Sequence, residues 1–305
     1  MNLSTVTAFK NLKTDNSKFI HMEGELLRRF QLELVEIMKD IVYVCEKYGY
    51  YYSLSGGSAL GALRHKGFIP WDDDMDIFML SSEKRAFIKA FQKEFNYKYW
   101  IHTPDTPGYG LEIGRIRLKG SLIRVREDLG SEECGFFIDI FWFENAPDNK
   151  VIRKLHGLMC MASGFALSCR NFYKNKALML ELLKDNPELK KVFYTKMALG
   201  FCVSFLSVTK CAQFTSKIYS ACKNNQSKYL TVPAGRKHYF GEMYLRNDVQ
   251  KVRKETFEEN SWNVPANLEM YLENMYGNYM YIPKKEERET HVVMELRFPI
   301  HDGAE

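Results

Sequence analysis

Hydrophobic residues recur every three or four positions near the start of the chain and stop at Gly49. This spacing is typical of one buried face of an amphipathic helix that a glycine ends. The positions that carry it are Leu27, Phe30, Leu34, Ile37, Ile41 and Cys45. A second helix follows Ser81 and Ser82, either of which can cap it, and its core face carries Phe87, Ile88, Phe91 and Phe95.

Elsewhere in the first half of the chain, strands are predicted at residues 51–54, 75–80, 111–119, 121–125 and 135–143. The second contains an apolar run, and the last three follow a change to the period of two that is typical of strands. The third and fourth are joined by a turn at Gly120, and a glycine turn with a small helix occupies residues 56–63. Helices and strands in this order predict an α+β fold with a sheet of modest size.

After Pro147 the pattern becomes mainly helical and basic, with a late helix from Pro265 to Tyr276 that Gly277 ends. We therefore expect three parts. Residues 1–24 are an N-terminal extension, residues 25–147 are the core, and residues 148–305 are a mainly helical elaboration that packs on the core.

The composition is that of an ordinary globular protein, with 305 residues, 46% hydrophobic content and a formal net charge of +5. There is no long run of basic residues, so nucleic acid is not an expected partner. Seven cysteines without a Cys-x-x-Cys pair argue against a disulfide framework and against a structural zinc site. The polar start lacks the pattern of a secretory signal, and we expect a cytoplasmic protein.

Two apolar stretches without charged residues run from Leu155 to Cys169 and from Met197 to Thr209. Both are too short to span a bilayer. They are either core helices or helices that lie on a membrane surface. The sequence leaves both interpretations open, so peripheral contact with the inner face of the membrane is one of the expectations.

The candidate chemistry centres on an aspartate run at residues 72–76. In a strand, Asp72, Asp74 and Asp76 would share one face, where three carboxylates repel each other. A hard cation such as Mg²⁺ or Mn²⁺ relieves this repulsion. The alternative is an exposed acidic turn, but Trp71 and Ile77 flank the run with bulky apolar side chains.

Gly56, Gly57 and Ser58 follow a predicted strand and open a helical turn, which is the arrangement of a phosphate cradle as well as of an ordinary tight turn. The order of cradle, short helix and paired carboxylates suits nucleotide phosphoryl chemistry with two metal ions.

Asp139 is the only charged residue in the apolar strand 135–143. A buried carboxylate must be paired, protonated or bound to metal, so Asp139 either pairs with Arg115 or Arg117 or completes the metal site from a second strand.

Basic side chains that can neutralise phosphate are Arg64, His65, Arg115 and Arg117, whereas Lys66 and Lys119 are better explained as solvated. No second histidine lies near His65 in the sequence, which argues against a zinc ligand there.

The run GGSALGALRHKGFIPWDDDMDI at residues 56–77 resembles the signature of the LicD family of phosphotransferases, which includes the fukutin-type proteins. FIDIF at 137–141 and the segment from Val264 to Gly277 are similar to later blocks of that family. The resemblance runs from about Glu25 to His291 and is weakest over residues 149–237.

This resemblance implies a nucleotidyltransferase-like mixed sheet and the transfer of phosphocholine or a polyol phosphate from a CDP-linked donor to a glycan or lipid-linked glycan, with release of CMP. It implies two Mg²⁺ or Mn²⁺ ions on Asp74, Asp76 and Asp139. Gly57 and Ser58 would bind the donor phosphates. Supporting or substrate-contacting roles are expected for Trp71, Asp72, Asp73 and His291. Residues 25–147 would then be the catalytic core, and the helical elaboration would bind the acceptor.

Three other functions remain open. A glycosyltransferase of the Asp-x-Asp type would release a nucleoside diphosphate, and a nucleotidyltransferase would leave the nucleoside phosphate on its acceptor. A membrane-surface scaffold that has kept the fold would show no metal-dependent binding of nucleotide.

Overall fold

The amphipathic helix at the start of the chain is α2 (Gly24–Tyr48), and it ends as its pattern predicts. Gly49 follows it in the left-handed conformation, with φ of 74°, which a residue without a Cβ adopts at little cost. This computed structural model describes residues 19–125, 128, 131–177, 179–180, 187–288 and 290–300. The buried face of α2 includes every apolar position that the sequence pattern picks out.

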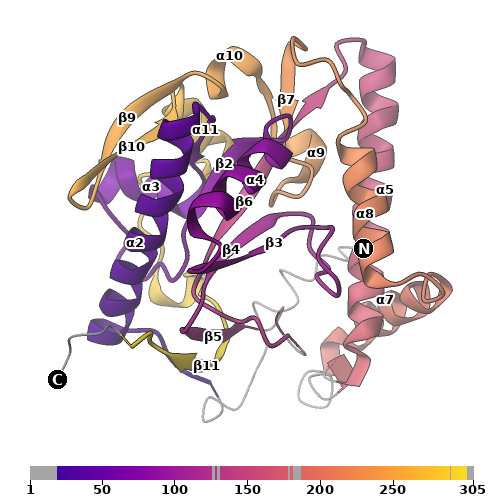
Figure 1. Ribbon diagram of the computed structural model, residues 1–305. Helices are drawn as coiled ribbons and strands as arrows, with labels where there is room; N and C mark the ends of the chain where they lie inside the picture. The colour runs from indigo at the N-terminus through magenta and orange to yellow at the C-terminus, as the bar shows by residue number, and fades with distance from the viewer. Residues whose placement is uncertain are drawn as a thin grey trace.

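A mixed sheet forms the centre of the molecule (Figure 1). Its main path is β1 (Ser53–Leu54), β2 (Asp76–Leu80), β6 (Phe137–Ala146), β4 (Gly114–Leu118) and β3 (Tyr99–His102). β2 and β6 are parallel, and the other pairs are antiparallel. The far end of β6 also pairs with β7 (Tyr229–Thr231), which pairs with β8 (Met243–Leu245). A mixed sheet with helices around it agrees with the predicted α+β class.

Helices α3 (Gly56–His65), α4 (Lys84–Phe95) and α11 (Leu268–Tyr276) complete the core. α4 packs against α2, and α11 packs against α3 and, through Tyr271, against Phe78 of β2 with ring centroids 5.5 Å apart. The predicted serine cap of α4 is wrong. Glu83 occupies the cap position, because the Ser81 hydroxyl instead donates to Glu144 Oε2 at 2.6 Å.

The turn at Gly120 is present, with φ of 80°, but it does not make a hairpin. β5 (Leu122–Val125) pairs with β11 (Val293–Arg297), a strand from the end of the chain. The physical reason is that β4 has β3 on one edge and β6 on the other. Both edges of β4 are therefore already paired, and β5 pairs with a strand from another part of the chain.

The expected helical elaboration is present as far as Tyr219, in α5 (Lys150–Lys174), η3 (Pro187–Leu189), α7 (Lys190–Cys202) and α8 (Val208–Tyr219). Figure 1 shows α5, α7 and α8 standing beside the sheet, on the side away from α2. None of the described helices combines the length and the apolar character that crossing a bilayer requires.

Beyond Tyr219 the chain is not mainly helical. Short helices α9 (His238–Gly241), α10 (Arg246–Val249) and η4 (Lys285–Glu287) alternate with strands, which include the hairpin of β9 (Val252–Phe257) and β10 (Asn260–Pro265). Side chains of this region, such as Val264 and Leu272, lie in the same hydrophobic core as α2. The boundaries at residues 24 and 147 stay predictions, and the core draws on residues from both sides of the second one.

Candidate active site

Asp76, Asp139 and Arg115 lie side by side on three neighbouring strands. The parallel pairing of β2 with β6 places Asp76 opposite Asp139, and the antiparallel pairing of β6 with β4 places Arg115 opposite Asp139. Arg115 donates from Nε to Asp139 Oδ1 at 2.5 Å and from Nη2 to Oδ2 at 2.7 Å. The arginine pair that the sequence left open is therefore present, and the metal-binding role of Asp139 stays a prediction.

Arg115 and Arg117 are both buried, with 3% and 1% of their surface exposed. Arg117 donates to Asp128 and to the carbonyl of Gly135, and both guanidinium groups lie over the ring of Phe137. These internal partners satisfy much of the hydrogen-bonding capacity of the two arginines. Their predicted contact with donor phosphate remains a prediction.

Gly56 and Gly57 allow carboxylates to come close to the start of α3. A Cβ on Gly57 would lie 2.6 Å from Asp72 Oδ2, and one on Gly56 would lie 3.1 Å from Asp76 Oδ2. The Gly56 N–H donates to the hydroxyl of Tyr271 at 2.8 Å. The paired glycines thus bring the aspartates and the amino end of a helix to the same place.

The aspartate run is held in place by hydrogen bonds to its backbone. The amide of Gln31 on α2 donates to the Asp72 carbonyl, and the Asp76 N–H donates to the buried hydroxyl of Ser58, both at 2.9 Å. Ser58 was expected to contact donor phosphate. In the structure its hydroxyl accepts from the N–H at the start of β2, and its contact with donor phosphate stays a prediction.

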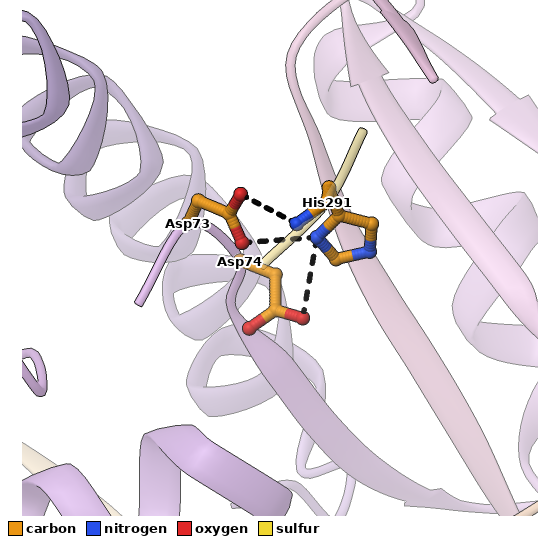
Figure 2. Close-up of side chains that lie close together, drawn as sticks. All are labelled: Asp73, Asp74 and His291. Carbon is orange, nitrogen blue, oxygen red and sulfur yellow. Dashed lines mark hydrogen bonds and ion pairs between the residues drawn. The ribbon is translucent and has the colours of Figure 1, made fainter. Parts of the chain in front are cut away.

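Asp73 and Asp74 meet His291 from the far end of the chain. Figure 2 shows both carboxylates beside the imidazole. Asp73 accepts from the His291 backbone N–H at 2.8 Å, and its other oxygen lies 3.0 Å from His291 Nδ1. Asp74 Oδ2 lies 3.9 Å from the same nitrogen. Among the described residues, these three form a group whose ligand atoms all lie within 4.8 Å of one another.

Burial and crowding raise the pKa of three aspartates in the run. Burial raises the pKa of Asp72 well above its ordinary value, and the neighbouring charges of Asp74 and Asp73 raise it further. Burial also raises the pKa of Asp76 strongly, with contributions from Asp74 and Asp139. For Asp74 burial raises the pKa, and the positive charge of His291 opposes that rise.

The donor set fits a hard divalent cation. Asp72 Oδ2 is buried and has no hydrogen-bond partner, and several carboxylates converge on one place where they raise one another's pKa. Carboxylate oxygens are the ligands that Mg²⁺ and Mn²⁺ prefer, and one imidazole is compatible with Mn²⁺. Asp74 belongs both to the predicted metal set and to the group with Asp73 and His291.

A cavity of about 520 Å³ opens in front of these carboxylates. One wall is the amino end of α3 with the aspartate run, and the other is α11 with the segment that follows it to His291. The volume lies within the range of small-molecule and cofactor sites.

Arg64 and Trp71 both line the cavity and support its second wall. Arg64 Nη1 donates to the carbonyls of Tyr279 and Tyr281, at 2.8 and 3.1 Å. The guanidinium of Arg288 stacks on the indole of Trp71 at 3.9 Å. His65 lies against Arg64, 3.4 Å from its Nε, and is not among the described residues that line the cavity.

Sequence reasoning missed most of the second wall. The cavity residues that it did not identify include Arg236, Glu242, Tyr271, Tyr276 and Arg288. Tyr271 and Tyr276 lie within the late helix, and aromatic residues at helical spacing are more often core residues. No local signal connects this segment to an aspartate run 200 residues earlier.

Comparison with known proteins gives matches that include this region. Residues 49–159 match the family model of the LicD/FKTN/FKRP nucleotidyltransferase domain. The chain is also similar to the lipopolysaccharide cholinephosphotransferase LicD of Haemophilus influenzae. The two share 27% identity over 283 residues, which cover 90% of this chain and 98% of that protein.

Two uncharacterized rickettsial proteins match shorter stretches. The one from Rickettsia prowazekii is 27% identical over 107 residues, which cover 28% of this chain and 40% of that protein. The one from Rickettsia typhi is 39% identical over 56 residues, or 18% of each chain.

Proposed function

We propose that this chain, whose residues 49–159 match the LicD/FKTN/FKRP family model, transfers phosphocholine or a related substituted phosphate. The donor is a CDP-linked compound, the acceptor is a hydroxyl of a glycan or lipid-linked glycan, and CMP is released. The product is a modified cell-surface polysaccharide or glycoconjugate.

The observation that carries this proposal is the convergence of carboxylates on one cavity in a chain that is similar to a cholinephosphotransferase over 90% of its length. Such a cavity suits a donor that has two phosphates. The aspartates can hold divalent cations against those phosphates, and the basic side chains of Arg236 and Arg288 also line the cavity.

Divalent cations are assigned to Asp74 with either Asp76 and Asp139 or Asp73 and His291, and when bound they supply neutralisation of the negative charge on the phosphates. The remaining roles belong to the chain itself. The amino end of α3 at Gly56 and Gly57 faces the donor phosphates. Ser58 and Gln31 position the aspartate run, and Trp71 with the tyrosines of the second wall encloses the donor and excludes water.

Transfer is a displacement at the distal phosphorus of the donor. A bond forms from the acceptor oxygen to this phosphorus, and the bond from the phosphorus to the bridging oxygen of CMP breaks. The proton of the acceptor hydroxyl passes to Asp139, which Arg115 holds in orientation. Arg115 is thus a positioning residue in this proposal.

The test is incubation of the full chain with CDP-choline, CDP-ribitol or CDP-glycerol, a glycan acceptor and Mg²⁺, with CMP as the measured product. Asp74→Asn removes a ligand common to both assignments and should lower turnover at least about a thousandfold, an extent typical of lost phosphate-neutralising groups. Asp105→Asn, an exposed aspartate outside the cavity, is the matched control and should retain full activity.

Binding of Mn²⁺, measured by calorimetry without substrate, separates the two ligand assignments. Loss of binding in His291→Ala but not in Asp139→Asn supports the Asp73, Asp74 and His291 group, and the reverse supports the predicted set. Full turnover in Asp74→Asn would overturn the assignment of the site. With a nucleotide sugar supplied as the donor instead, release of a nucleoside diphosphate would identify a glycosyltransferase. With the CDP compounds, transfer of the nucleoside phosphate to the acceptor would identify a nucleotidyltransferase.

A further inference from the structure

Helix α5 exposes an apolar stripe along its first four turns. Leu155, Leu158 and Met159 are 58%, 52% and 55% exposed, and Val151 and Phe165 extend the stripe at either end. Their spacing of three and four residues places them on one face of the helix. The stripe is about 20 Å long, from the rise of 1.5 Å per residue. A contiguous exposed patch of this kind marks an interaction surface.

The stripe continues onto neighbouring segments. At its carboxyl end Lys196 of α7 lies over the ring of Phe165, at 5.7 Å from the centroid, and Gly200 packs on Cys169 and Tyr173 of α5. The chain that leaves α7 exposes Phe205, 81% of whose surface is accessible. At its amino half, Phe240 of α9 packs against Gly157 and is also exposed.

The same region is strongly basic. Residues 150–228 hold 14 lysines and arginines but only 3 acidic residues, a formal charge of +11, whereas the whole chain carries +5. The remainder of the chain therefore has a formal charge of −6. This count gives a magnitude to the basic character that the chain acquires after Pro147. No acidic residue falls within α5, α7 or α8.

We propose that α5, together with α7, is a docking surface for an anionic phospholipid bilayer. The stripe enters the boundary between headgroups and acyl chains, and exposed lysines such as Lys150 and Lys154 contact lipid phosphates. A second copy of this chain would place one basic face against another. A polynucleotide would match the lysines but would leave the apolar stripe in water. An anionic membrane satisfies both features.

The surface is connected to the cavity by a short segment. Tyr239 of α9 packs on His156 of α5, with ring centroids 5.2 Å apart, and Arg236, three residues earlier, lines the cavity. A bilayer bound to α5 therefore lies close to one wall of the candidate active site. This connection fits an acceptor carried on a lipid, a point that rests on the proposed function, whereas membrane binding itself does not.

The experiment measures sedimentation of the full chain, without substrates, with vesicles of phosphatidylcholine alone or mixed in equal parts with phosphatidylglycerol. We expect binding to the mixed vesicles and little binding to the neutral ones. Leu158→Glu should weaken binding about tenfold or more, because it places a negative charge in the apolar stripe. Lys150→Gln with Lys154→Gln should weaken it roughly thirtyfold, at about 1 kcal/mol per lysine.

The matched control is Leu32→Glu. Leu32 is 48% exposed, close to the exposure of Leu158, but it lies on α2 on the other side of the sheet, so its replacement should leave vesicle binding unchanged. Binding should also fall as salt is added, because screening shortens the reach of the lysines. Absence of binding to mixed vesicles, equal loss in the control variant, or a dimer that Leu158→Glu disrupts without any vesicle binding would each overturn the proposal. Because no substrate is present, failure here is distinguishable from failure of the proposed reaction.

Discussion

The carboxylate of Asp72 lies against the backbone of Gly57. Its Oδ2 is buried without a hydrogen-bond partner and lies 2.6 Å from where a Cβ on Gly57 would be. The glycine is therefore required by a neighbouring carboxylate as well as by any ligand. The Gly-Gly pair was interpreted from the sequence as a phosphate cradle. The close approach of the Asp72 carboxylate is a separate reason for glycine at this position, and the two explanations are compatible.

Gly57→Ala tests this contact. In the native protein the new methyl group displaces the Asp72 carboxylate, and we expect the free energy of unfolding to fall by about 1 to 3 kcal/mol, as for other overpacked sites. In the Asp72→Ala background the collision is absent. The same change should then be neutral or slightly stabilising, because alanine favours a helix over glycine.

Urea unfolding of the four proteins in this cycle gives the coupling between the two sites. Equal effects of Gly57→Ala in the two backgrounds would show that the Asp72 contact does not determine the choice of glycine.

At the scale of elements, the site depends on the order of three strands. β6 lies between β2 and β4, and only this order puts Asp139 between Asp76 and Arg115. The individual strands β2 and β6 follow from their apolar runs. The pairing of β5 with β11 does not follow from a local pattern, because it depends on which strand edges of the sheet remain unpaired.

Arg115→Met tests the coupling of β4 to β6. It leaves Asp139 buried without its ion-pair partner, and we expect a loss of about 3 to 5 kcal/mol in the free energy of unfolding. Arg85→Met, at an exposed arginine of α4, is the control and should change stability little.

The double variant Arg115→Met with Asp139→Leu removes both charges and should recover much of that loss. A single variant as stable as the native protein would mean that the Asp139 carboxylate has another partner in solution.

At the scale of the whole molecule, further acidic side chains have a raised pKa, and Glu112 and Glu144 are not among the described residues that line the cavity. Burial raises the pKa of Glu112, Glu144 and Glu242 to about 7 in each case. A carboxyl group with a raised pKa binds its proton more tightly in the folded state. The stability that it contributes is present below about pH 4.5 and is lost as the pH rises through about 7.

Glu144→Gln should remove one such contribution. The variant should match the native protein in stability near pH 4 and exceed it by about 3 kcal/mol above pH 8, from a shift of roughly 2.5 pH units. Urea unfolding across this pH range provides the measurement. A difference that does not change with pH would contradict the raised pKa of Glu144.

Glu94→Gln is a control for which the stability difference from the native protein should change with pH in the opposite direction. Hydrogen bonds from Tyr48 and Lys47 lower the pKa of Glu94, so this carboxylate contributes stability above its ordinary pKa. That contribution is lost as the pH falls, and the variant should lose stability relative to the native protein as the pH rises.

The sequence by itself determined the parts of this protein whose information is local. Amphipathic periodicity predicted α2 and α4, apolar runs predicted β2 and β6, and the run at residues 56–77 with the lone Asp139 predicted where the chemistry lies. Helix and strand periods are properties of neighbouring residues, and a charged residue in an apolar strand is conspicuous without knowledge of its neighbours in space.

Tertiary structure decided which of these residues meet. It paired Asp139 with Arg115 and placed His291 beside Asp73 and Asp74. It formed the second wall of the cavity from residues 271–291. It also left the apolar stripe of α5 exposed, where the sequence had allowed either a core helix or a surface one. These outcomes depend on strand order, open sheet edges and packing between segments that are distant along the chain, which local periodicity does not encode.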